Sequence, residues 1–256
     1  QLYPDGTEGD GSKEKPYLIS NDLELARLAH EVNNGTELQM FSQKYFKLTK
    51  DIDLSKGLWT PIGTAQGIAK ASDGHFFAGK FDGDGHSVSN LLIKWSFNTA
   101  KEASWGLFAR LNGKGNNENE YAAVTNLIID NALIEKLEAH MPLNNANYTV
   151  KMGIVVADMT QNAELSNIII RNSKITDNNE SFSTKTKFRI GGIAGYLNNF
   201  VSLRIFNISA DTEIDVFRNA ALNGVEGQVT ISCGFGAASK LANQTGYVVW
   251  PRNIYV

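Results

Sequence analysis

The sequence predicts an all-β fold, a parallel β-helix built as a three-faced solenoid of stacked coils. The main observation is a short apolar phrase that recurs in one order, usually followed by a second, β-branched strand. Its copies are WGLFARL (105–111) with VTNLIIDNALI (124–134), MGIVVADM (152–159) with LSNIIIRNSKI (165–175), GGIAGYL (191–197) with LRIFNISADTEI (203–214), CGFGAAS (233–239), and an earlier degenerate copy, FFAGKFDG (76–83) with VSNLLIKW (88–95). Self-similarity at a nearly fixed period is typical of stacked repeat architectures.

The second observation is that the spacing between copies varies while the strands stay short. Glycines near the first strand are 47, 39 and 42 residues apart, at Gly106, Gly153, Gly192 and Gly234. Isoleucines assigned to the second strand are 36, 41 and 38 residues apart, at Ile93, Ile129, Ile170 and Ile208. Segments such as VTNLIID and LSNIIIR are rich in β-branched residues and bounded by Asn, Ser and Asp, which is typical of strands. The pattern therefore predicts fixed strands joined by loops of variable length.

Each full copy contains three predicted strands, for example Gly192–Leu197, Leu203–Ile208 and Glu213–Phe217. Three strands in every repeat predict three faces per coil, with like residues stacked between coils. The predicted interior columns are Leu107, Ile154, Ile193 and Phe235, and Ile129, Ile170 and Ile208. The alternative is a β-sandwich with coincidental similarity, and five echoes in one order argue against it.

The first quarter of the chain contains the one predicted α-helix, at about residues 21–34. Asn21 is an N-cap residue, Glu24 follows at the spacing of a capping box, and Asn34-Gly35 is a stop signal. The apolar stripe of this helix predicts that it caps the open end of the solenoid. The stripe consists of Leu25, Leu28, Ala29 and Val32. Strands are predicted beside the helix, in PYLIS (16–20), YFKLTKDIDLS (45–55) and WTPIG (59–63).

We expect residues 1–256 to form a single domain. Residues 1–63 would supply the lead-in, the helix and the first strands, and residues 75–256 about five coils with corner-loop insertions. A chain of 256 residues with 42% hydrophobic residues is large enough for one long core. Because the chain starts at Gln1 rather than Met, we expect a processed or trimmed product.

Composition excludes several classes of function. The net charge of −3 and the absence of basic runs argue against nucleic acid as the main partner. No apolar segment approaches the roughly 20 residues that span a bilayer. Cys233 is the only cysteine, which excludes an intrachain disulfide and a cysteine zinc site. Cys233 lies in a repeat strand, so we interpret it as a buried core thiol, with a nucleophile as the alternative.

The N-terminal segments resemble a known family. GTEGDGSKEKPYLISNDLELARLAHEVNNG, YFKLTKDIDLS, WTPIG and FFAGKFDGDGHSVSNLLI are similar to bacterial surface proteins with the GLUG motif, in a segment also found near some immunoglobulin A peptidase regions. The resemblance covers residues 6–93 well and the later repeats loosely. It implies a right-handed parallel β-helix on an exported or cell-surface protein, and it implies no activity.

The four-residue motif of that family is only partly kept. Gly192-Ile193-Ala194-Gly195 has both glycines, whereas the second glycine is replaced at Ala109, Val156 and Ala237. Close backbone approach at the second position is therefore not expected in every coil.

Two clusters could carry chemistry near the first repeat. Asp82 and Asp84 in FDGDGH (81–86) resemble half of a calcium loop, because alternating acids supply hard oxygen ligands. No acid follows at the position that completes such a loop, and Asp-Gly pairs form turns, so we expect a turn and no cofactor, with calcium as the alternative. His75 and His86 flank the same strand and could join these acids as metal ligands or as an acid/base group. Surface or turn histidines are the simpler interpretation.

An enzyme of β-helix fold, such as a polysaccharide lyase or hydrolase, is one alternative function. Such sites need paired carboxylates, or calcium-binding acids with a base, from successive coils on one face. Asp130, Arg171 and Asp211 follow the second strand in three copies. A ladder of mixed charges is the simpler interpretation of these residues, and fold alone does not specify activity.

The polar insertions between repeats favour a binding module over an enzyme. Three of them, at 138–148, 177–187 and 218–227, follow the third predicted strand and so project from one corner. Asn-rich loops with aromatic rings can hydrogen-bond sugar hydroxyls and stack on sugar rings. The candidate ligand-binding residues are Tyr121, Asn144, Asn145, Tyr148, Asn178 and Phe182. We expect a monomeric, exported module that binds a glycan or an extracellular protein, and a structural spacer is a further alternative.

Overall fold

The computed structural model describes residues 9–68, 74–95, 102–115, 117–136, 149–177, 187–198, 203–216, 229–232, 234–239 and 252–256. In these residues the strands form three sheets, and all but one of their pairings are parallel. The exception is the antiparallel pairing of β5 (Gln66–Ile68) with β10 (Glu102–Trp105). The predicted all-β fold with parallel sheets is confirmed.

The largest sheet, sheet A, has eleven strands among the described residues. They are β1 (Tyr17–Ile19), β3 (Tyr45–Leu48), β4 (Ile52–Asp53), β7 (Lys80–Asp82), β8 (Ser87–Ser89), β9 (Leu92–Trp95), β12 (Ala122–Asp130), β13 (Leu133–Lys136), β16 (Ala163–Asp177), β19 (Leu203–Val216) and β22 (Arg252–Tyr255). Sheet B contains β2 (Gln39–Met40), β6 (Phe76–Phe77), β11 (Phe108–Leu111), β15 (Val156–Met159), β18 (Ala194–Asn198) and β21 (Phe235–Ser239). Sheet C contains β5, β10, β14 (Thr149–Gly153), β17 (Lys187–Gly191) and β20 (Val229–Ser232).

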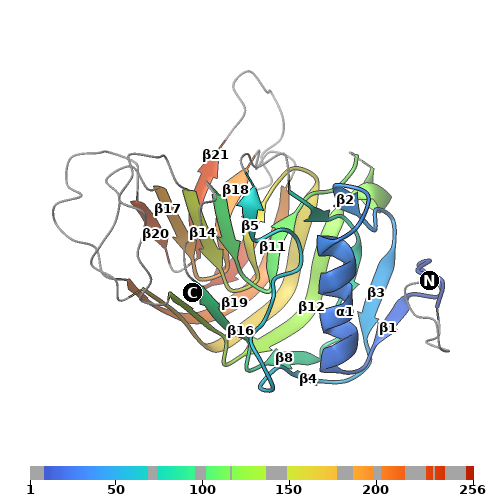
Figure 1. The fold of residues 1–256 in the computed structure, drawn as a ribbon, viewed down its shortest axis with the longest axis horizontal. Coiled ribbons are helices and arrows are strands. Elements are labelled where there is room, and N and C mark those ends of the chain that lie inside the picture. Colours follow the sequence, from blue (N-terminus) through green and yellow to red (C-terminus); the bar gives the residue numbers. More distant parts are fainter. Residues whose placement is uncertain are drawn as a thin grey trace.

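The chain visits the three sheets in a repeating order. It passes from sheet C to sheet B to sheet A in β10, β11 and β12, and again in β14, β15 and β16. Two further rounds follow, in β17, β18 and β19 and then in β20, β21 and β22. Each strand pairs with its equivalent in the next round, so the rounds stack as coils (Figure 1).

The strands of one coil differ from those predicted. The second and third predicted strands of the copy at 203–217 form one continuous strand, β19. Sheet C was missed, because its strands TVKMG, KFRIG and VTIS are short and run directly into the glycine-bearing turn. The predicted number of three strands per coil is correct. The predicted boundary between the second and third strands is wrong, because both belong to β19, and the remaining strand of the coil lies in sheet C.

Strand register corrects one interior column by two residues. Ile129 pairs with Ile170 as predicted, but Ile170 pairs with Ala210, whereas Ile208 pairs with Ile168. All of these side chains are buried, because a shift of two keeps a side chain on the same face.

Register also tests the position of Ile93 and the second predicted interior column. Ile93 belongs to a separate column, and the pairs run through Ile93, Ile134, Ile175 and Ile214. In the remaining predicted column, Leu107, Ile154 and Ile193 are fully buried in the core. Phe235 is partly buried and pairs with Ala194 rather than with Ile193.

Register also corrects the position of the second glycine. In sheet B the strand pairs on either side of this position align Ala109, Ala157, Gly195 and Gly236 in one column. Val156 and Ala237 are each one residue away from this column. Glycine is therefore kept in two coils, and alanine takes its place in the other two. At Gly195 an added Cβ would lie 2.7 Å from the backbone nitrogen and oxygen of Met152, so only glycine fits there.

The helix α1 (Asp22–Asn33) forms where the sequence predicts it. The Asn21 side chain accepts a hydrogen bond from the Glu24 amide at 3.0 Å, which confirms the N-cap. The Glu24 carboxylate accepts a hydrogen bond from the Ser20 amide, one residue before the N-cap. The predicted stripe is buried in the main core. Figure 1 shows α1 at the end of the stack where β1 and β3 lie. In the part of the chain that the structure describes, no helix has the length and apolar character needed to cross a membrane.

Candidate functional site

A row of hydrogen-bonded asparagine amides crosses the coils on the outside of sheet A. Asn126 Nδ2 donates to Asp82 Oδ1 at 2.9 Å, Asn167 Nδ2 donates to Asn126 Oδ1 at 2.9 Å, and Asn207 Nδ2 donates to Asn167 Oδ1 at 3.0 Å. We call Asp82, Asn126, Asn167 and Asn207 the first asparagine column. It links four successive coils, because each member comes from a different one.

A second asparagine column, Asp53, Asn90 and Asn131, runs parallel to the first. Asn90 Nδ2 donates to Asp53 Oδ1 at 2.8 Å, and Asn131 Nδ2 donates to Asn90 Oδ1 at 2.7 Å. The amide of Asn90 is the main cause of the lowered pKa of the Asp53 carboxyl. In the next coil Asn172 donates instead to Asp130 Oδ1 at 2.9 Å, so this column ends there.

These asparagines occupy positions that most residues avoid. The φ angles of Asn90, Asn126, Asn131, Asn167, Asn172 and Asn207 lie between 50 and 58°. Asn is the residue apart from Gly that tolerates this left-handed region best. A left-handed residue interrupts the extended geometry of a strand, so the strand bends there. Each such bend places one polar side chain at the same point of successive coils.

The segment between the two columns has alternating side chains. In β12, Leu127 and Ile129 are buried, whereas Ile128 between them lies on the outer face. Register places Ile128 beside Ile169 of β16, and Ile169 beside Ser209 of β19. Ser209 in turn pairs with Tyr255 of β22. The outer face therefore has one column, Ile128, Ile169, Ser209 and Tyr255, in which Ile169 is 43% exposed and Tyr255 is 68% exposed.

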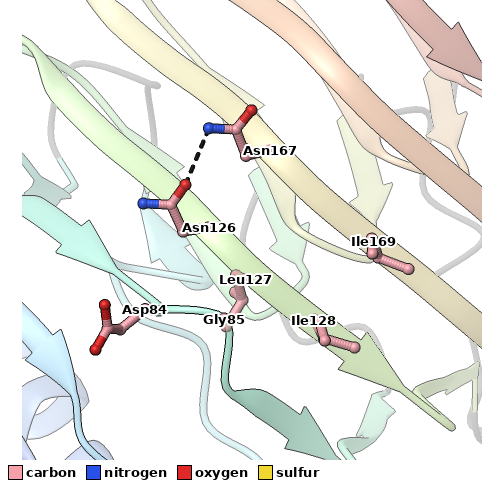
Figure 2. Close-up of a pocket in the computed structure, with 7 residues that line it drawn as sticks. All are labelled: Asp84, Gly85, Asn126, Leu127, Ile128, Asn167 and Ile169. Atoms are coloured by element: carbon pink, nitrogen blue, oxygen red, sulfur yellow. Dashed lines mark hydrogen bonds between the residues drawn. The ribbon is translucent and has the colours of Figure 1, made fainter.

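Two open hollows follow this outer column. The first has a volume of about 370 Å³ and is lined by Asp84, Gly85, Asn126, Leu127, Ile128, Asn167 and Ile169 (Figure 2). The second has a volume of about 400 Å³ and is lined by Ile168, Ile169, Asn207, Ile208, Ser209 and Tyr255. They share Ile169, so we treat them as one shallow depression, the sheet A groove. Figure 2 shows the isoleucines on one side of the paired amides of Asn126 and Asn167.

The acidic residues predicted after the second strand are held in polar contacts. Asp130 Oδ2 accepts a hydrogen bond from Arg171 Nη2 at 3.2 Å, and its other oxygen accepts from Asn172. Register shifts by one residue after Ile170, which leaves Asp211 opposite Arg171 and Asn172. The three predicted residues therefore lie in one stack of mixed charge.

The candidate calcium ligands Asp82 and Asp84 are also engaged. Asp82 Oδ1 accepts from the Asp84 amide at 2.8 Å as well as from Asn126, and Asp84 Oδ2 pairs with Lys47 Nζ at 3.0 Å. Asp84 and Gly85 have φ angles of 51° and 80°, and the His86 amide donates to the Gly83 carbonyl. This is the geometry of a type I′ turn, which favours Asp-Gly. In Figure 2 the Asp84 carboxylate points away from the two amides.

The two histidines have separate partners. A ring nitrogen of His75, Nδ1, lies 2.9 Å from the Asn33 carbonyl oxygen, and Nδ1 of His86 lies 3.4 Å from Asp51 Oδ1. The pKa of Asp51 is lowered, chiefly by the Ser87 amide. Among the described residues no group of three His, Cys, Asp or Glu side chains lies close enough to hold a metal ion.

Tyr121, the one candidate ligand-binding residue that the structure describes, packs against cations. The Arg204 guanidinium lies 4.7 Å from the Tyr121 ring centroid and Lys80 Nζ lies 6.0 Å from it. Arg204 also pairs with Glu118 Oε1 at 2.8 Å, and Lys80 Nζ donates to the Glu118 carbonyl at 2.6 Å. Burial lowers the pKa of Lys80. The ring is therefore part of a contact that ties the 118–121 turn to β7 and β19.

The other candidates lie outside the described residues. They are Asn144, Asn145, Tyr148, Asn178 and Phe182, together with Cys233 and almost all of the three corner loops.

The asparagine columns were missed at the level of sequence, although a signal exists. TNLIIDN and SNIIIRN both contain two asparagines five residues apart, at equivalent places in two repeats. In the sequence alone these residues are typical of strand boundaries, because Asn is depleted in strands. Their recurrence at a fixed offset within the β-branched run is what distinguishes a column from a boundary.

Comparisons with known proteins give two likenesses. No family model matches the chain. Halomucin from Haloquadratum walsbyi is 28% identical over 191 residues, which cover 73% of this chain and 2% of halomucin. Among solved structures, a candidate immunoglobulin A1 protease from Bacteroides ovatus is 15% identical with a TM-score of 0.42, and the match covers 96% of this chain and 76% of that one. The chain therefore corresponds to only a small part of halomucin.

Proposed function

We propose that this chain is a non-catalytic module of an exported or cell-surface protein, and that it binds an extended glycan along the sheet A groove. The proposal includes a right-handed β-helical winding, with α1 covering the N-terminal end of the core. The observation that supports binding is the groove itself, in which exposed apolar side chains lie beside a regular row of amides.

The row of amides suits a polymer of repeating polar groups. Neighbouring parallel strands lie about 4.7–4.9 Å apart, so the amides of the first asparagine column recur at about that interval along the stack. The column uses one donor and one acceptor of Asn126 and Asn167, and an amide has two of each. An extended sugar chain presents hydroxyl groups at regular intervals, and these can both donate and accept.

The apolar floor of the groove suits the C–H face of a sugar ring. Ile128 and Ile169 present aliphatic surface, on which the C–H face of a sugar can lie. Tyr255 adds an exposed aromatic ring at the far end of the second hollow. Aromatic side chains bury large areas and keep one polar group available for hydrogen bonding.

The arrangement of carboxylates supports binding over hydrolysis. A glycosidase needs two carboxylates facing one bond, one of them able to carry a proton. Asp82 in the groove region is held by two hydrogen-bond donors, and Asp130 is held by a cation and an amide. Calcium binding at Asp82 and Asp84 would have to displace Asn126 and Lys47. We therefore propose binding that needs no metal, which a chelator tests directly.

The corner loops remain part of the proposal as a second contact region. Tyr121 lies beside the turn at 118–120, and we propose Asn144, Asn145, Tyr148, Asn178 and Phe182 as further ligand contacts. An extracellular protein that binds these loops is the alternative ligand.

The experiment introduces aspartate at two exposed aliphatic residues of equal size, one in the groove and one outside it. Ile169→Asp places a charge on the floor of the groove, and Leu23→Asp places the same charge on the exposed side of α1, where the native side chain is 75% exposed. On a panel of immobilised neutral and acidic polysaccharides, we expect wild type and Leu23→Asp to be retained equally, with and without chelator. Ile169→Asp should lose at least tenfold in retention. Equal retention of both variants would place the contact elsewhere, and no retention of wild type would favour a spacer. The appearance of new reducing ends would instead indicate an enzyme.

A further inference from the structure

Four charged side chains are gathered in a buried cluster formed by sheets B and C. Lys151 Nζ lies 2.7 Å from Asp158 Oδ2 and 3.1 Å from Glu102 Oε2, and Arg110 Nη2 lies 3.5 Å from the same Asp158 oxygen. The side chains of Lys151, Asp158 and Arg110 are 4%, 1% and 1% exposed, and that of Glu102 is 20% exposed. None of these residues belongs to the sheet A groove.

The fold places the four groups together through strand register. Lys151 in β14 and Asp158 in β15 lie seven positions apart, on either side of the turn from sheet C to sheet B. Arg110 in β11 pairs with Asp158, and β10, which contains Glu102, pairs with β14. The Tyr196 ring centroid lies 5.2 Å from Lys151 Nζ. The four charged groups are therefore enclosed by protein, on paired strands that cannot move apart independently.

Burying these four side chains in their charged forms is unfavourable in free energy. Taking ions out of water is costly, and the attraction within a pair offsets that cost only where the remaining polar atoms are satisfied. Asp158 Oδ1 is buried and makes no hydrogen bond within the described part of the chain. An uncharged form of the Lys151 and Asp158 pair removes two of the four charges and leaves Arg110 and Glu102 as one cation and one anion.

We propose that Lys151 and Asp158 condense spontaneously to an intramolecular amide, with Glu102 as the catalytic acid and base. Lys151 Nζ lies 2.7 Å from Asp158 Oδ2, and the carboxyl carbon is bonded to that oxygen. The attacking nitrogen and the carboxyl carbon are therefore close to the separation of about 3–3.5 Å that favours reaction. Proton transfer along that hydrogen bond gives a neutral amine and a neutral carboxylic acid. The Nζ–Cγ bond then forms, the negative charge of the tetrahedral intermediate develops on Asp158 Oδ1, and the protonated Oδ2, which lies near Arg110, becomes the hydroxyl group that leaves.

The remaining protons balance through Glu102. Its carboxylate accepts a proton from the attacking nitrogen and returns it to the hydroxyl group that leaves, so that the C–O bond breaks and one water is released. Glu102 is the most exposed member of the cluster at 20%, although its Oε2 atom, which faces Lys151, is buried. The reaction needs no oxidant and no cofactor.

Intact mass tests the proposal better than stability does. The new bond closes a loop of only seven positions, and short loops contribute little to the entropy of the unfolded chain. We expect the denatured protein to weigh one water less than its sequence, with a branched peptide that joins Lys151 to Asp158 after digestion. Lys151→Arg keeps the charge but forms no such amide, so it should have the full mass. Glu102→Gln should also have the full mass, because it removes the proton acceptor.

The controls separate this bond from other losses of water. Asp-Gly sequences such as Asp82-Gly83 can lose water by cyclising, and that loss would persist in Lys151→Arg. A full mass for wild type, or a water loss that persists in Lys151→Arg, would overturn the proposal. Complete cross-linking in Glu102→Gln would overturn the role of Glu102.

Discussion

Substituting Gly195 with alanine tests how tightly β18 packs against its neighbours. A Cβ at this position would lie 2.7 Å from the Met152 nitrogen and oxygen and 2.8 Å from the Ala157 carbonyl oxygen. All three contacts are with backbone atoms, which cannot rotate away. Met152 and Ala157 belong to β14 and β15, each paired on both sides by neighbouring strands, so relief of the clash must shift several strands at once.

The expected cost follows from two opposing effects. Overpacking a well-filled region costs roughly 1–3 kcal/mol, and three simultaneous backbone contacts favour the upper end. Alanine recovers about 0.5–1 kcal/mol, because glycine loses more conformational entropy in a strand. The net destabilisation of Gly195→Ala is therefore about 2 kcal/mol. For a chain of this size that corresponds to a fall in Tm of roughly 4–8 °C.

Urea unfolding followed by circular dichroism measures this difference, with Gly57→Ala as the matched control. Gly57 has no atom within 4 Å of its added Cβ, so its substitution should change stability by no more than about 0.5 kcal/mol. Equal midpoints for the two variants would refute the argument that backbone contact fixes glycine at position 195.

Two further predictions concern the N-terminal helix and one end of the second asparagine column. Leu28→Ala should lower the free energy of unfolding by about 2–5 kcal/mol, because Leu28 is fully buried. Leu23→Ala, on the exposed face of the same helix, should leave the free energy of unfolding nearly unchanged. Urea titration measures both variants, and equal effects would contradict the packing of α1. Asp53, whose pKa is lowered mainly by the Asn90 amide, should stabilise the fold above the ordinary pKa of about 3.9 and lose that effect as pH falls through its lowered value. The difference in stability between wild type and Asp53→Asn should therefore shrink from pH 7 to pH 3, and a difference independent of pH would show that the carboxylate charge is unimportant.

The sequence predicted the elements that local pattern determines. The N-cap at Asn21 and the buried stripe of α1 follow from residue type and helical spacing within one segment, and both are confirmed. The parallel stacking of Ile129 on Ile170 follows from similarity between copies, which is also local in each copy. These features need no knowledge of how distant segments meet.

Features that depend on contact between coils were beyond this reasoning. Ile208 was placed two residues away from its true partner, because an alternating pattern cannot reveal a shift of two residues that keeps the same face. Asn126 and Asn167 are informative only once their amides are seen to hydrogen-bond across coils. Lys151 and Glu102 belong to neighbouring coils, and nothing in their local sequences indicates that they share one buried site.

The pairing of β12 with β16 stays in register from Ala122 to Asp130, although the repeats differ in length. Loops at the corners can therefore lengthen or shorten without moving the outer face of sheet A. An added coil would extend the groove by one amide and one floor residue, at the same spacing as before. Under the proposed glycan binding, affinity for a long polymer would then rise with the number of coils as a multivalent effect, and the length of the solenoid would set the shortest chain that binds well.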